Sequence, residues 1–370
     1  MKSDCLSLKE AQRLMLSSQK LTGAVQTPLQ IIEHLGYVQI DTISVVERAH
    51  HHVLWTRCPK YQPSDLESLV KARKVFEYWS HAASYLPMRD YRFTLPMKKK
   101  FAEKKSSWSP REPKLMKRVL KRIQREGPLR SKDFKAEQKS TSSGWWDWKP
   151  AKKALERLFL EGQLEITRRE GFQKVYDLPE RVIPEAVDTS YPSQKEHMRF
   201  LIQRTLRHHG LATAGEIGYL QKKNVVENIR KELHEMSDSR EIVKVTVEGV
   251  AQPYYAFPKA IERIPRVSSK ILLLSPFDNF VIQRKKLAHF FQFDYQIECY
   301  VPEAKRKYGY FCLPIFNGVV PVGRIDCKAD RVNKQLLIRS LHIEKNVNKK
   351  DDEVKIEAQL RSFAKFNKCH

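Results

Sequence analysis

One order of predicted secondary-structure elements occurs twice along the chain, and this repeat constrains the fold more than any other feature. Residues 113–180 predict an amphipathic helix, a short second helix, a third helix and then two short strands around a "REGF" turn. Residues 193–256 predict three helices and a hairpin in the same order. Three helices followed by a two-stranded wing is the order of a winged-helix module, and the first 100 residues fit a third, looser copy. We interpret the pattern as a repeat of element order rather than of residue identity.

The repeat divides the 370 residues into four segments. We expect an N-terminal winged-helix-like unit at 1–110, a second winged helix at 111–185 and a third at 186–266. Short β-runs such as "QIECYVP" and "QLLIRSLHI" then take over, so a β-rich C-terminal unit with a terminal helix is expected at 267–370. The predicted fold class is α+β, built from tandem winged-helix modules and this β-rich unit.

The charge balance points to a polyanionic partner. The chain has 68 Lys and Arg residues against 43 Asp and Glu residues, a net charge of +25. Such an excess repels itself in the folded state, but each cation set against a phosphate releases condensed counterions. Nucleic acid is therefore the expected partner, and an acidic membrane surface is the weaker alternative because no strongly apolar amphipathic helix stands out. The sequence also offers no apolar run near the roughly 20 residues that a membrane span needs, and its start lacks the apolar middle of a signal peptide.

Cysteine spacing argues against a metal or redox site. The six cysteines lie far apart and form no CxxC pair: Cys5, Cys58, Cys299, Cys312, Cys327 and Cys369. A zinc ribbon and a redox motif both need such pairs, so we interpret these residues as reduced thiols in a cytosolic protein. We expect no metal site and no cofactor.

Three other polar clusters receive a structural interpretation. The histidines at 50–52 in "AHHHVLW" point in different directions if they lie on a helix, so they cannot converge on one ion and are expected to be packed or surface residues. His208 and His209 are interpreted as a basic helix end. "SPFDN" at 275–279 has the composition of a turn, with Asp278 and Asn279 supplying the turn chemistry.

Residues 37–42, "YVQIDT", contain the motif that could do chemistry. Side chains alternate between the two faces of a strand, so Tyr37, Gln39 and Asp41 are expected on one face, with Gln39 and Asp41 roughly 6.6 Å apart along the chain. A carboxylate beside an amide can hold a water molecule between them. The carboxylate could act as a base on that water, or offset the positive charge that develops on a sugar during glycosidic cleavage. From the pattern alone, two structural interpretations are favoured: a solvated strand face, or Asp41 as the cap of a helix that begins near Ser44.

Several cationic positions favour contact with DNA phosphates. A predicted helix carries six cations between residues 114 and 125 with only Glu126 nearby, although helices normally pair such charges at i,i+4. Lys152 and Lys153 lie near the start of a third helix, where a winged helix usually meets DNA. The remaining candidates lie at two predicted hairpin tips: Arg168 and Arg169 in "ITRREGFQK", and Lys305, Arg306, Lys307 and Tyr308 in "EAKRKYGYF". An ordinary solvated surface is the alternative at each position.

Long blocks of the sequence resemble a known family. "LLLSPFDNFVIQRKKL" and "FQFDYQIECYVPEAKRKYGYFCLPIFNGVVPVGRID" resemble the AlkZ-like (also called YcaQ-like) family of winged-helix DNA glycosylases, as do "FEYWSHAASYLP" and "LGYVQIDTISVVERAHHHVLWTR". The resemblance spans nearly the whole chain in order. It implies tandem winged helices around a concave DNA-binding face, closed by a β-rich unit.

The resemblance also implies an activity. Members of this family hydrolyse the N-glycosidic bond of N7-alkylated purines, and some unhook interstrand crosslinks between two guanines. Their catalytic element is Gln, an apolar residue, and then Gln or Asp, which matches Gln39, Ile40 and Asp41 here. The Asp version resembles the branch with broader crosslink unhooking. The implied partner is double-stranded DNA with alkylated purines or interstrand crosslinks, handled by a monomer in DNA repair.

Two function classes follow from these observations. The first is a monofunctional DNA glycosylase, since the motif has no lysine for a Schiff base. The second is a non-catalytic winged-helix protein, either a transcriptional regulator or an architectural protein, for which repeated winged helices and high positive charge are equally expected. The pairing of Gln39 with Asp41 on one strand face favours the enzyme, because a regulator has no need for it.

Overall fold

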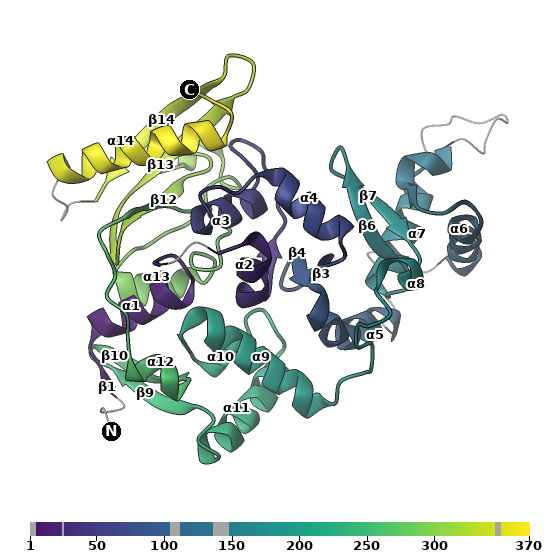
Figure 1. The fold of residues 1–370 in the computed structure, drawn as a ribbon, viewed down its shortest axis with the longest axis horizontal. Helices are drawn as coiled ribbons and strands as arrows, with labels where there is room; N and C mark the ends of the chain where they lie inside the picture. Colours follow the sequence, from purple (N-terminus) through teal and green to yellow (C-terminus); the bar gives the residue numbers. More distant parts are fainter. Residues whose placement is uncertain (1–4, 24–25, 104–111, 136–147, 345–348) are drawn as a thin grey trace. The chain divides into compact units, whose positions relative to one another are not determined.

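The protein is a mixed α/β protein (Figure 1), seen here in a computed structural model that describes residues 5–23, 26–103, 112–135, 148–344 and 349–370. The chain separates into two compact units, one formed by residues 1–62 with 195–370 and the other by residues 63–194. The four segments expected from the sequence stay a prediction. Across the described ranges, no helix combines the length and the apolar character needed to cross a bilayer.

The unit of residues 63–194 begins with a helix and a hairpin. Its first elements are α4 (Pro63–Lys71), β3 (Val75–Trp79), β4 (Ala83–Pro87), the 3₁₀ helix η1 (Met88–Thr94) and α5 (Leu95–Glu103). β3 and β4 pair antiparallel from Val75 opposite Pro87 to Trp79 opposite Ala83. The pairing forms because aromatic and β-branched residues fit a pleated, half-buried surface.

The second half of this unit combines helices with a three-stranded sheet. It contains α6 (Pro113–Glu126), β5 (Leu129–Arg130), η2 (Ser131–Lys135), α7 (Trp148–Leu160), β6 (Glu165–Glu170), β7 (Gln173–Asp177) and α8 (Pro179–Val182). The strands form a sheet in the order β5-β7-β6. α6 buries Met116, Val119 and Ile123 on one side, as its helical spacing predicts. The short second helix predicted for "PLRSKDF" is instead the strand β5 followed by a 3₁₀ turn.

The other unit brings the N-terminal residues together with the second repeat. The N-terminal elements are β1 (Cys5–Leu6), α1 (Leu8–Ser18), α2 (Pro28–Leu35), β2 (Val38–Gln39) and α3 (Ala49–Arg57). The repeat consists of α9 (Gln194–His209), β8 (Leu211–Ala212), α10 (Ala214–Ile217), α11 (Lys223–Asp238), β9 (Val243–Val247), β10 (Val250–Ala256) and α12 (Pro258–Glu262). Its sheet has the order β1-β9-β10-β8, with β1 parallel to β9. The N-terminal strand therefore extends the hairpin of the second repeat.

The C-terminal part of this unit is a four-stranded antiparallel sheet covered by a helix. The strands are β11 (Ile271–Leu273), β12 (Leu313–Asn317), β13 (Val320–Asp330) and β14 (Gln335–Ile343), in sequence order across the sheet. Along the sequence, two helices separate β11 from β12: α13 (Arg284–Phe291) and the 3₁₀ helix η3 (Glu303–Lys305). The terminal helix α14 (Lys349–Phe366) contacts β11 and β14 (Figure 1). Two expectations are wrong here. "QIECYVP" contains no strand, and residues 303–308 form a 3₁₀ turn and a loop instead of a hairpin tip.

Candidate active site

The helix before the motif is defined by local sequence chemistry. Thr27 caps α2 in a capping box with Gln30, Pro28 occupies its first turn, and Gly36 ends it in the left-handed conformation with φ 76°. These caps confirm the helix predicted at this position. A side chain at position 36 would also collide with Arg204, whose Cδ lies 2.5 Å from the place of a Cβ. Glycine is therefore needed at position 36 both for the turn and for the close approach of α9.

Tyr37 fixes the start of the motif. Its carbonyl oxygen accepts a hydrogen bond from Asn279 Nδ2 at 3.1 Å. Its ring packs edge-on against His208 with centroids 6.0 Å apart, and the guanidinium of Arg204 lies 5.7 Å from the ring centroid. Tyr37 is buried, and burial raises the pKa of its phenol well above the ordinary value. Tyr37 therefore anchors the segment and does not belong to a solvated face.

The structure corrects the backbone predicted around Asp41. The strand β2 covers only Val38–Gln39, and the helix expected from Ser44 begins at Ala49. Asp41 therefore does not cap that helix. Its Oδ2 instead accepts the backbone N–H of Ile43 at 2.9 Å in a local turn. The prediction of a solvated strand face is also wrong for Gln39, which is only 8% exposed.

Burial controls the acidity of Asp41. The side chain is half-buried, and this desolvation raises the pKa of the carboxyl above its ordinary value. The backbone N–H groups of Ile43 and Thr42 and the positive charge of Arg48 oppose the shift without cancelling it. A carboxylate with a raised pKa binds a proton more strongly, which suits a group that takes a proton from water.

The turn at Cys299 and Tyr300 lies within the electrostatic reach of Asp41. Burial and then the Asp41 carboxylate raise the pKa of the Cys299 thiol. Partial desolvation, followed by the charges of Cys299 and Asp41, raises the pKa of the Tyr300 phenol. Tyr300 is 78% exposed, so this turn presents an aromatic side chain to solvent.

The same turn carries the predicted DNA-binding loop. The buried carboxylate of Glu298 accepts the backbone N–H groups of Lys307, Tyr308 and Gly309 at 2.8, 2.7 and 3.1 Å. These bonds lower the pKa of Glu298, although burial alone would raise it. Arg306 Nε donates to the carbonyl of Val301 at 2.9 Å. The cationic loop is therefore held against the turn that faces Asp41.

The four candidates on this loop differ in exposure. Lys305 and Lys307 are exposed, whereas Arg306 and Tyr308 are half-buried. Arg306 lies over the Tyr310 ring at 5.0 Å from its centroid. The Tyr308 ring packs against His342 and lies beneath Arg324, whose guanidinium carbon is 4.0 Å from the ring centroid. The two lysines are thus the members of this set whose charge faces solvent.

The other four DNA-binding candidates lie in the unit of residues 63–194. Lys152 and Lys153 are exposed near the start of α7. Arg168 is exposed and donates to Glu170 at 2.6 and 2.9 Å. Arg169 instead forms a two-point ion pair with the buried Glu77 at 2.6 and 2.7 Å, which ties the β6-β7 hairpin to β3.

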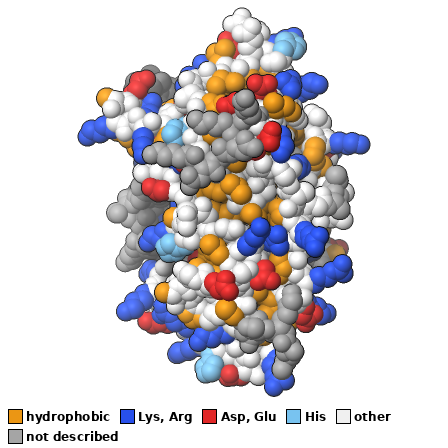
Figure 2. Space-filling view, turned by 90° about the vertical axis from the view of Figure 1, so that its left-hand side faces the viewer, with side chains coloured by type: hydrophobic (Ala, Val, Ile, Leu, Met, Phe, Trp, Pro, Cys, Tyr) orange, Lys and Arg blue, Asp and Glu red, His pale blue; other side chains and the backbone are white. Residues whose placement is uncertain are grey.

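The cations of α6 line a hollow on the protein surface. Among the lining residues that the structure describes, none is acidic. This hollow has a volume of about 430 Å³, and its lining is Lys114, Lys117, Arg118, Lys121, Arg122, Arg125 and Phe134. Glu126 pairs with Arg122 and Arg125 at 2.9 and 2.5 Å. Figure 2 shows Lys and Arg side chains spread over the face that it presents, in keeping with the net charge of +25.

A buried polar network under the motif is what the sequence reasoning missed. "SPFDN" does form a turn, since the N–H of Asp278 bonds to the carbonyl of Ser275 at 3.0 Å. In addition, Asp278 and Arg57 form a two-point ion pair at 2.7 and 2.9 Å, with both side chains 0% exposed. Arg57 Nε also donates to the carbonyl of Gln19 at 2.7 Å. The fully buried Asp278 and Asn279 are therefore structural supports of the site and more than turn residues.

The histidine clusters are packed inside the protein. His52 bonds to the carbonyl of Leu273 at 3.0 Å, and His51 bonds to the hydroxyl of Tyr61 at 2.6 Å. His208 and His209 end α9, as predicted, but both are buried, so they do not make this helix end basic. Burial lowers the pKa of both well below the ordinary value, which keeps the two rings neutral.

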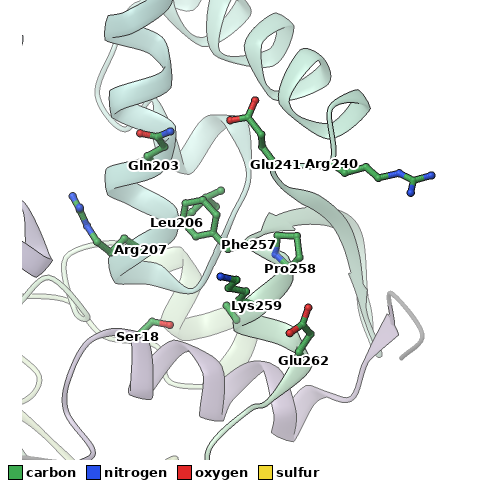
Figure 3. A pocket seen from close by; sticks show the side chains of 11 residues that line it. Ser18, Gln203, Leu206, Arg207, Arg240, Glu241, Phe257, Pro258, Lys259 and Glu262 are labelled. Atoms are coloured by element: carbon green, nitrogen blue, oxygen red, sulfur yellow. The ribbon is translucent and has the colours of Figure 1, made fainter. Parts of the chain in front are cut away.

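A larger cavity lies apart from these residues. It has a volume of about 860 Å³ between α1, α9 and α12, and none of the described candidate residues lines it (Figure 3). Leu206 and Phe257 lie side by side at its centre, whereas Arg207 and Arg240 point outward on opposite sides. A substrate pocket needs polar groups that converge on the ligand, and this cavity does not supply them.

Two comparisons with known proteins agree on the fold. A family model described as "DNA glycosylase AlkZ-like" matches residues 32–366, a range that includes Gln39 and Asp41. The solved structure of Streptomyces sahachiroi DNA glycosylase AlkZ matches with a TM-score of 0.67 and 16% sequence identity. The match covers 100% of this chain and 98% of that chain. At this identity the likeness concerns the fold, and it confirms the predicted mixture of helices and sheets.

Proposed function

The chain belongs to the family of AlkZ-like DNA glycosylases, and from this premise we propose that it removes N7-alkylated purines from DNA and unhooks interstrand crosslinks between the N7 atoms of two guanines. The observation that carries the proposal is the placement of Asp41. The carboxylate is half-buried, its pKa is raised, and the turn beside it holds a cationic loop. Such a site can stabilise positive charge on a sugar and activate water next to bound DNA.

The leaving group needs little help from the protein. An N7-alkylguanine carries a positive charge, and the electron pair of the C1′–N9 bond neutralises the ring when that bond breaks. The deoxyribose is left as an oxocarbenium-like cation, which the negative charge of Asp41 stabilises. Water then bonds to C1′ and passes one proton to the Asp41 carboxylate, which leaves an abasic site and a free neutral base.

Gln39 serves this step as a positioning group for the water or the deoxyribose. Its side chain is largely buried, so little rotational freedom remains to it. The motif carries no lysine that could form a Schiff base with the sugar. The reaction therefore ends at hydrolysis, as in a monofunctional glycosylase.

The helices and hairpins of both units suit a grip on double-stranded DNA. We interpret α6 to β7 and α9 to β10 as winged helices that contribute to a concave DNA-binding face. Lys152, Lys153, Arg168, Lys305 and Lys307 supply exposed charge for the phosphates. The cations of α6 extend this set. A crosslinked base cannot flip out freely, since it is tethered to the opposite strand, so an exposed site read through shape and charge fits this substrate better than a deep pocket. The working form is a monomer at the nucleoid in the cytoplasm.

A non-catalytic winged-helix regulator is the alternative function. The same order of helices and strands and the same net charge favour it. Two properties distinguish it from the enzyme. A regulator releases no base from DNA, and it prefers a particular undamaged sequence.

Two substrates test the proposal. Methylated duplex DNA should release 7-methylguanine and become alkali-labile. A defined nitrogen-mustard crosslink should be separated into single strands on a denaturing gel. Wild type and Asp41→Asn are compared on both. Footprinting with strong sequence preference and no base release would establish the regulator instead.

A further inference from the structure

Tyr300 presents an aromatic ring to solvent at the candidate active site. It is 78% exposed, which makes it the most exposed Phe, Trp or Tyr side chain among the residues whose burial the structure describes. It stands on the turn between Glu298 and Val301, whose N–H bonds to the carbonyl of Glu298 at 2.9 Å. A side-chain hydrogen bond joins it to Cys299. Its exposure therefore belongs to a hydrogen-bonded turn and not to a loose chain end.

Two contacts hold this turn in a fixed relation to the cationic loop. The Glu298 carboxylate accepts the backbone N–H of Tyr308 at 2.7 Å from one side. The Arg306 guanidinium donates to the Val301 carbonyl at 2.9 Å from the other. Tyr300 lies between these anchors in the sequence, so its backbone is held beside the loop that carries Lys305 and Lys307. A rigid aromatic beside a cationic loop is the arrangement that proteins use to stack on a base while holding its backbone.

The charge of the candidate catalytic carboxylate acts on the same turn. The Asp41 charge contributes to the raised pKa of Cys299 and of Tyr300, so its field reaches the turn at both residues. Because the pKa of the Tyr300 phenol is raised, the phenol stays neutral and does not compete with Asp41 as a charge. Asp41 is proposed to act on the sugar of a bound lesion, so the turn of Tyr300 lies within electrostatic range of the group that meets the sugar.

We propose that Tyr300 stacks on the damaged base and selects cationic purines over neutral ones through a cation–π interaction. This role rests on the proposed function, and it names the property by which the substrate is recognised. An electron-rich ring attracts a cation over its face, whereas it stacks on neutral guanine without that gain. The charge of an N7-alkylpurine is delocalised over a flat ring system, so stacking and charge recognition use the same geometry.

The inference is tested by binding to duplexes that cannot be cleaved. One duplex carries 2′-fluoro-7-methylguanosine, which keeps the positive base while the fluorine blocks glycosidic cleavage. Its partner carries 2′-fluoroguanosine at the same position and is neutral there. Wild type, Tyr300→Phe, Tyr300→Leu and Tyr300→Ala are titrated with both duplexes at one salt concentration. Since the side chain is exposed, none of these substitutions opens a cavity, and circular dichroism checks the fold.

We expect wild type and Tyr300→Phe to prefer the cationic duplex, because both have an aromatic ring. Tyr300→Leu and Tyr300→Ala should lose about tenfold in this preference, which is the size of one cation–π interaction. The kcat/KM for 7-methylguanine release should fall by a similar factor in the same two variants.

Two results would overturn the role of Tyr300. One is an unchanged preference in Tyr300→Ala. The other is an equal loss of affinity for both duplexes. This would mean that the ring inserts between base pairs of the DNA whether or not the base is charged. Both differ from failure of the proposed function, in which wild type itself releases no 7-methylguanine from methylated DNA.

Discussion

The side-chain amide of Asn279 donates to the carbonyl oxygen of Tyr37 at 3.1 Å, so a buried turn from the C-terminal part of the chain holds the segment that carries Gln39. Removal of this bond should disturb the motif without touching DNA. Asn279→Ala leaves the Tyr37 carbonyl without this donor, and a lost buried hydrogen bond costs about 1–3 kcal/mol of stability.

Asn279→Ala should also lower kcat with little change in the affinity for abasic-site DNA, because the water and the sugar lose their alignment. Single-turnover kinetics and equilibrium binding separate these effects. Asn333→Ala, at an exposed turn of the same unit, is the control and should leave kcat and binding unchanged. The variant could also be less stable and yet keep the full kcat at a temperature where it is folded. That result would contradict a positioning role for Asn279.

Asp41→Asn should abolish most of the activity while DNA binding stays. The amide cannot accept a proton from water or offset charge on the sugar, and groups of this kind contribute roughly 10²–10⁴-fold to a rate. Release of 7-methylguanine measures the first effect, and fluorescence anisotropy with abasic-site DNA measures the second. Asp238→Asn removes an exposed carboxylate of the same unit and should retain full activity.

The acid limb of the pH profile should report Asp41. Burial raises the pKa of this carboxyl above the 3.8 of an unperturbed aspartate, and only the ionised form accepts a proton. The kcat/KM of wild type should therefore fall, as the pH is lowered, at a pH above 3.8. Asp41→Asn should show a flat residual profile over this range, and the acid limb should persist in Asp238→Asn. An acid limb that also persists in Asp41→Asn would assign it to another group.

The same shift predicts a cost of Asp41 to stability. Because its pKa is raised in the folded state, the folded protein binds more protons than the unfolded one between the two pKa values, and stability falls as the pH rises through that window. At neutral pH the ionised carboxylate thus destabilises the fold. Asp41→Asn should raise the Tm at pH 7, and the gain should vanish below pH 3.8, where both states are protonated. Scanning calorimetry at the two pH values measures this, and an unchanged or lower Tm at pH 7 would contradict it.

The sequence predicted those parts of the site that local chemistry determines. Thr27, Pro28 and Gly36 define α2 through capping and a left-handed turn, and each acts on its immediate neighbours. The loop at 303–308 was mistaken for a hairpin, since its conformation depends on the carboxylate of Glu298, which lies several residues upstream.

Contacts between distant parts of the chain leave no periodic pattern. β1 pairs with β9, joining Cys5 to Thr246, and Arg57 finds Asp278 across a similar separation. His208 and His209 resembled a basic helix end for the same reason, because only the packing around them shows that they are buried. The candidate motif of Gln39 and Asp41 can be proposed from the sequence because only Ile40 separates the two residues, whereas its supports come from distant parts of the chain.

Charge reversal on α7 should weaken DNA binding without altering the chemistry. Lys152 and Lys153 are exposed, and each phosphate contact contributes about 0.9 to the slope of log K against log salt. Lys152→Glu with Lys153→Glu should lower this slope by about 2 and leave the single-turnover rate on saturating DNA unchanged. Arg169→Gln is the contrast in the same unit. It leaves the buried Glu77 with Lys174, at 3.9 Å, as its remaining cationic partner, so it should cost up to about 3 kcal/mol of stability while the salt slope changes little. An unchanged slope in the double variant would remove both lysines from the interface.

The ion pair between Arg57 and Asp278 should be among the strongest single couplings of its unit. Both side chains are 0% exposed, and Asp278 Oδ1 also accepts the N–H of Phe280 at 2.9 Å. Arg57→Met leaves a buried carboxylate without its cation, which costs about 3–5 kcal/mol. A double-mutant cycle with Asp278→Asn, followed by urea unfolding, isolates the pair from the other bonds of each residue.

The exposed pair between Lys195 and Glu235, at 2.6 Å, provides the comparison for this cycle. Solvent screens that exposed pair, so its coupling should be close to zero. The buried pair should exceed it several-fold, because no water replaces the lost partner. Equal coupling energies in the two cycles would mean that water reaches Arg57 and Asp278. The ion pair would then stabilise the turn that holds Tyr37 less than its burial indicates.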